Sequence, residues 1–133
     1  MIRLDGDSLR KAWPQLRPMI EKARKKSRCT DPFIVEDIYH QCMIQDTFCY
    51  VTGEGSQIDG VLFLRPVNNF GESELHIWIG TFQRPAQLSD HIGFVEGLGR
   101  HIKAKRITCL SPRMFDKMWP NSKAVSKRFE KEL

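Results

Sequence analysis

The sequence contains no long apolar run. Its uninterrupted apolar stretches, such as residues 60–64, cover only a few positions, whereas a helix that crosses a bilayer needs about 20. Residues 1–10 alternate charged and apolar side chains and lack the apolar stretch of a secretory signal. We therefore expect a protein without a membrane-spanning helix that remains in the cytoplasm.

Metal-binding and disulfide patterns are also missing. The four cysteines form no CxxC pair, and the four histidines are scattered along the chain. These spacings argue against a zinc ribbon and against a disulfide scaffold. With 133 residues, 41% hydrophobic and 28% charged, the chain has the size and balance of one domain over residues 1–133.

Charge is distributed in three blocks. Residues 3–28 carry a net charge of +6, residues 29–99 of −8 and residues 100–133 of +7, for a total of +5. Two basic ends indicate either a polyanionic partner, such as nucleic acid or an acidic protein, or the solvated faces of ordinary helices. The first interpretation requires that the basic side chains near Lys25 lie beside those near Lys127.

The first third of the chain predicts two helices. Leu16, Ile20 and Ala23 recur at helical spacing and predict a main helix over residues 14–26, after a cap at Asp7 or Ser8. Because proline lacks a backbone donor, either a short turn precedes Pro14 or one helix is kinked there. Residues 35–42 predict a second, shorter helix.

The rest predicts a mixed α/β (α+β) sheet. Residues 47–52 and 58–66 predict a hairpin, and residues 74–81 a third strand with one buried face. A helix over residues 89–103 leads to a fourth strand at 106–111, which we expect to run parallel to the third. A short helix follows at 114–119. The expected core contains Leu16, Ile20, Ile38, Val61, Phe63, Leu75, Ile77, Ile79, Val95, Leu98, Ile107 and Cys109.

This order of elements resembles the GNAT (N-acetyltransferase) superfamily, and particularly its small bacteriophage-type members. AWPQLRPMIEKA and PFIVEDIYHQCM resemble the first two helices of those proteins, ELHIWIG the central strand, and KRITCLSPRMFDKMW the late strand with its following segment. The resemblance covers nearly the whole chain. It implies a GNAT-like fold, acetyl-CoA as cofactor and an amine as acceptor.

The resemblance also implies a set of site residues. Family members bind the cofactor's pyrophosphate through a glycine-containing loop after the central strand, where backbone donors approach the phosphates. Here that loop reads QRPAQLS from Gln83, without either expected glycine, and Pro85 removes a donor. The implied cofactor-binding residues are Ile79, Thr81, Gln83, Arg84, Ser89 and Arg113.

Glu74 and Ser111 are the implied catalytic residues. Glu74 has the chemistry of a general base, although a glutamate on a strand is also typical of a solvated face. His76 and Trp78 share its face by the strand period, so the three could line a cleft, or His76 could simply be a packing residue. Ser111 follows a strand end, where it either contacts a ligand or forms part of the turn at Pro112.

Two functions remain open from sequence. The chain is either an N-acetyltransferase or a catalytically inactive GNAT-like protein that binds a protein or nucleic acid. Cys109 is interpreted as a core residue, because the pattern places no base beside its thiol.

Overall fold

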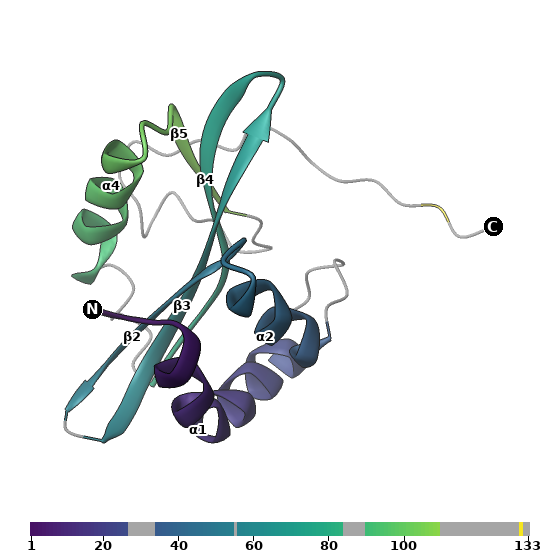
Figure 1. Ribbon diagram of the computed structural model, residues 1–133, viewed down its shortest axis with the longest axis vertical. Coiled ribbons are helices and arrows are strands. Elements are labelled where there is room, and N and C mark those ends of the chain that lie inside the picture. Colours follow the sequence, from purple (N-terminus) through teal and green to yellow (C-terminus); the bar gives the residue numbers. More distant parts are fainter. Residues whose placement is uncertain (27–33, 55, 84–89, 110–130, 132–133) are drawn as a thin grey trace.

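The computed structural model describes residues 1–26, 34–54, 56–83, 90–109 and 131. Its elements are β1 (Ile2–Leu4), α1 (Gly6–Lys26), α2 (Val35–Met43), β2 (Phe48–Glu54), β3 (Gln57–Asn69), β4 (Glu72–Phe82), α4 (Ile92–His101) and β5 (Arg106–Cys109). Helices α1 and α2 cover one face of the sheet and α4 the other (Figure 1). The mixed α+β fold is confirmed, while the helix expected at 114–119 lies outside the described residues.

The five strands are arranged in the order β1-β2-β3-β4-β5. The first three pairings are antiparallel, and β4 and β5 are parallel. Helix α4 makes the crossover between them, as a parallel pair requires. The expected parallel pair is confirmed. Strand β1 was not predicted, because a three-residue strand carries too little alternation to be recognised.

Strands β3 and β4 form a long hairpin with a tight turn. Asn69 pairs with Glu72, so the turn consists of Phe70 and Gly71, whose φ angles are 53° and 81°. Two positive φ angles are the signature of a type I′ turn, which matches the twist of the flanking strands. Phe70 is fully exposed at this tip.

Helix α1 is continuous through Pro14 and Pro18. The interpretation with a separate turn before Pro14 is therefore wrong. The expected cap also shifts, since the helix begins at Gly6, and the hydroxyl of Ser8 accepts a hydrogen bond from the backbone N–H of Asp5 at 3.0 Å. No helix in the described part of the chain is long and apolar enough to span a membrane.

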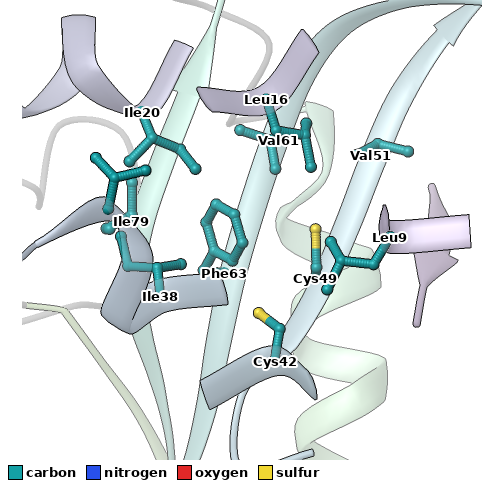
Figure 2. Close-up of a cluster of buried hydrophobic side chains, with 11 residues drawn as sticks. Leu9, Leu16, Ile20, Ile38, Cys42, Cys49, Val51, Val61, Phe63 and Ile79 are labelled. Atoms are coloured by element: carbon teal, nitrogen blue, oxygen red, sulfur yellow. The ribbon is translucent and has the colours of Figure 1, made fainter. Parts of the chain in front are cut away.

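The first core lies between the sheet and helices α1 and α2. It is shown in Figure 2 and contains Leu9, Leu16, Ile20, Val35, Ile38, Cys42, Cys49, Val51, Val61, Phe63 and Ile79. Trp13 and Tyr39 close its rim with ring centres 4.8 Å apart. The free energy gained by burying these aliphatic side chains offsets the cost of the backbone hydrogen bonds that the two prolines of α1 cannot make.

The second core lies under α4. It contains Tyr50, Leu62, Leu64, Leu75, Ile77 and Val95. Leu98, Ile107 and Cys109 pack against it but are only partly buried, which corrects their expected place in the core. They lie on the short last strand and on one helix, where nothing else in the described residues covers them completely.

Candidate functional site

A β-bulge at Trp78 interrupts the central strand. On the β3 side, Leu64 pairs with Ile77 and Phe63 pairs with Ile79, so Trp78 is the extra residue. Trp78 and Ile79 both pack against the α1/α2 core, whereas Ile77 belongs to the α4 core. The expectation of one buried face for this strand is therefore wrong, because β4 is covered on both faces. The extra residue of the bulge turns Ile79 to the α1/α2 core, although Ile77, two positions earlier, faces the α4 core.

Beyond the bulge, β4 continues without β5. The parallel pairing runs from Glu74 opposite Arg106 to Ile77 opposite Cys109, and β4 extends to Phe82. Within the described ranges no strand pairs with this side of residues 78–82, which we call the free edge of β4. The bulge and the end of the β5 pairing thus coincide.

The free edge presents backbone groups of alternate residues. The backbone N–H of Gln83 donates to the carbonyl of Asp59 on β3 at 2.9 Å. Because successive residues of a strand direct these groups to opposite edges, Thr81 also faces β3, while Gly80 and Phe82 face the free edge. An extended ligand alongside β4 could therefore hydrogen-bond to Gly80 and Phe82.

A polar row crosses the sheet one step before the bulge, on the α1/α2 face. His76 of β4 pairs with Arg65 of β3 and with Thr108 of β5. The Nδ1 atom of His76 lies 2.8 Å from the hydroxyl of Thr108. The guanidinium carbon of Arg65 lies 4.5 Å from the centre of the Trp78 ring, a cation–π contact that holds Arg65 over the bulge.

The next row toward the hairpin tip is an ion-pair cluster. Glu74 is buried, and its carboxylate lies 3.4 Å from the guanidinium of Arg106. Arg106 also forms an ion pair with Glu72, and Glu72 forms a second ion pair with Lys105 at 3.5 Å. The reading of Glu74 as a solvated surface residue is therefore wrong, because its side chain is only 8% exposed.

These surroundings shift the pKa values of two side chains, His76 and Glu72. Burial lowers the pKa of His76, and the charge of Arg65 lowers it further, while Glu74 acts in the opposite direction. The hydrogen bond and charge of Arg106 lower the pKa of Glu72. His76 is therefore held in its neutral form at pH 7, beside fixed charges of both signs.

The structure brings part of the expected site together. Glu74, His76 and Trp78 share one face, and Ile79 and Thr81 follow on the same strand. Four other candidates lie outside the described residues: Arg84, Ser89, Ser111 and Arg113. The same holds for most of the basic side chains whose proximity the polyanion hypothesis requires.

Sequence reasoning missed Arg65, Arg106 and Thr108. Each becomes part of the site only through its pairing partner on β4, and pairing register cannot be read from one sequence. The one available signal was Arg65, a charged residue at the end of the apolar run VLFL.

The architecture is that of the GNAT acetyltransferases, and solved structures supply the comparison. No family model matches the sequence, and no curated protein does. An aminoglycoside acetyltransferase from an uncultured soil metagenomic sample, solved in complex with trehalose, is 14% identical, with 99% of this chain and 94% of that chain covered and a TM-score of 0.73.

Two further structures extend the range of proteins with this fold. A GNAT family acetyltransferase from Staphylococcus aureus is 13% identical, with 99% of this chain and 96% of that chain covered and a TM-score of 0.70. A transcriptional regulator from Bacillus halodurans is 13% identical, with 90% and 94% covered and a TM-score of 0.62. At these identities the likeness establishes the fold.

Proposed function

We propose that this chain, as a single domain over residues 1–133, is an N-acetyltransferase that transfers an acetyl group from acetyl-CoA to an amine. The observation that carries this proposal is the free edge of β4, which begins at the bulge where β5 ends its pairing. The pantetheine arm of acetyl-CoA is an extended chain with two amides, and amides of that kind pair with an open strand edge.

The free edge has the chemistry that such a chain requires. Gly80 and Phe82 direct backbone donors and acceptors outward, and Gly80 is exposed. Ile79 and Thr81 alternate with them and flank the contact. Acetyl-CoA supplies the activated thioester, and Gln83, Arg84, Ser89 and Arg113 remain its proposed phosphate and loop contacts.

The acceptor side of the proposal rests on the α1/α2 face. Glu74 and Ser111 are the catalytic residues that the resemblance implies, and Glu74 lies on the same face as Trp78 of the bulge. Soil-derived and staphylococcal acetyltransferases share this fold, which supports an amine acceptor. The bacteriophage-type subclass and the cytoplasmic location are part of the proposal and rest on the sequence pattern.

A thermal-shift titration with acetyl-CoA tests the proposal. At a hundred times its dissociation constant the cofactor stabilises the wild type by about 2.7 kcal/mol. Gly80→Pro removes the outward N–H and should abolish the shift, whereas Gly80→Ala keeps that N–H and should retain it. Both variants place a Cβ 3.2 Å from the flexible end of Leu62, so they are matched sterically at that atom.

The alternative is a GNAT-like protein that binds a protein or nucleic acid without catalysis. It is favoured by the loop at residues 83–89, which lacks the expected glycines, and by the transcriptional regulator that shares the fold. If millimolar acetyl-CoA does not raise the Tm of the wild type, the enzyme proposal fails and this alternative is favoured. Circular dichroism of Gly80→Pro confirms that the variant is folded before its binding is compared.

A further inference from the structure

The polar row beside the bulge contains a histidine held between two strands. His76 has Arg65 directly opposite on β3 and Thr108 directly opposite on β5. Its Nδ1 atom is within hydrogen-bond distance of the Thr108 hydroxyl, at 2.8 Å. Among the described residues no group bonds to its Nε2 atom, and the side chain is only half-buried.

We propose that His76, oriented by Thr108, accepts the proton of the acceptor's ammonium group in the acetyl transfer, in place of Glu74. This inference rests on the proposed N-acetyltransferase function and names a catalytic residue for it. Thr108 is a positioning residue, because it acts through the imidazole.

Geometry disfavours Glu74 as the base. Its carboxylate already pairs with the guanidinium of Arg106 at 3.4 Å, so this ion pair would have to open before the carboxylate could contact an acceptor. It also lies two residues farther than His76 from Trp78 along β4. His76 is the titratable residue of β4 closest to the bulge on this face.

The surroundings of His76 suit a base that works near neutral pH. When Nδ1 carries the ring proton and donates it to Thr108, the lone pair on Nε2 is available. The charge of Arg65 on β3 disfavours the imidazolium form of His76, and the charge of Glu74 on β4 favours it. Arg106 of β5 forms an ion pair with Glu74, one row away from His76. Burial and Arg65 prevail, so the pKa of His76 is lowered and the ring is a free base at pH 7.

The proton and bond changes balance without another reactant. The acceptor ammonium gives one proton to Nε2, directly or through one water, and the amine attacks the acyl carbon of the thioester. The C–N bond forms while the C–S bond breaks, and the second nitrogen proton goes to the departing sulfur. The products are the acetylamide and free coenzyme A thiol, and the imidazolium returns its proton to solvent.

Thiol release from acetyl-CoA tests this assignment, with sisomicin, spermidine and a lysine-containing peptide as acceptor probes. His76→Gln should lower kcat by about 100- to 10,000-fold, the range of a general base, with the acetyl-CoA thermal shift retained. Thr108→Val should lose part of that activity, and Thr108→Ser should restore it. His101→Gln, an exposed histidine at the end of α4, is the matched control and should keep full activity.

A pH profile separates a base from a structural residue. The acid limb of kcat/KM should lie below the ordinary titration range of histidine, and Arg65→Gln should move it to higher pH, because the lowering charge is gone. If His76→Gln retains wild-type kcat, or if Glu74→Gln loses far more activity than His76→Gln, the inference fails while the proposed function stands. If the wild type binds no acetyl-CoA and releases no thiol, the proposed function fails and the inference fails with it.

Discussion

Gly60→Ala should destabilise the protein through one aromatic ring. A Cβ atom at Gly60 would overlap the ring of Phe82 on the paired strand, and it would lie only 2.8 Å from the methyl group of Thr52. The Phe82 ring must then leave β3 and lose its stacking against His91, whose ring centre is 5.9 Å away. Overpacking of this kind costs about 1–3 kcal/mol.

Thermal unfolding followed by circular dichroism measures this cost. For a chain of 133 residues, the unfolding entropy converts about 1–3 kcal/mol into a fall in Tm of about 4–11 °C. Gly97→Ala is the control, because a Cβ there meets nothing within 4 Å and alanine favours a helix interior over glycine. The same chemical change in α4 should therefore raise Tm.

A double-mutant cycle identifies the ring as the cause. In a Phe82→Ala background the substitution at Gly60 should cost much less, since the overlapping atoms are gone. An unchanged or raised Tm of Gly60→Ala refutes the steric reasoning. An equal cost in both backgrounds assigns the clash to Thr52 instead of Phe82.

Three other outcomes follow from the structure. Phe70→Asn should stabilise the hairpin by about 1 kcal/mol in urea unfolding, because asparagine tolerates the positive φ of 53° in a type I′ turn better than phenylalanine; a loss of stability contradicts this. Burial raises the pKa of the Cys42 thiol to about 12, so its modification by a disulfide reagent in native protein should be about 1,000-fold slower than in urea; comparable rates contradict its burial. Because the pKa of His76 is lowered, the unfolded chain binds its proton first as pH falls below the ordinary value of 6.5. The wild type should therefore lose more Tm than His76→Gln between pH 7.5 and pH 5.5, and equal losses refute the shift.

The fold was predictable where hydrophobic period and turn residues agree. The short helix around Ile38 and the three central strands have clear periods, and the crossover rule makes the last pair parallel. The bulge at Trp78 was hidden, because ELHIWIGT alternates as regularly as an undisturbed strand. Continuity of α1 through Pro14 was also hidden, since it depends on tertiary burial and not on helix propensity.

The site was predictable only along one strand. Period two places Glu74, His76 and Trp78 on one face, and the structure has them so. What surrounds them comes from β3 and β5, whose register is fixed by packing. The burial of Glu74 beside Arg106 therefore could not be foreseen, and neither could the contact of His76 with Thr108.

The sheet order has a consequence for how the chain folds. Strands β2, β3 and β4 follow one another in sequence and in the sheet, so each of their pairings closes a short loop. Strand β1 reaches β2 only after α1 and α2, and β5 reaches β4 only after α4, at a larger entropic cost of loop closure. Pulse-labelled hydrogen exchange should therefore show β3 amides protected first and those of β5 later, so that the edge bordering the proposed catalytic row is completed last.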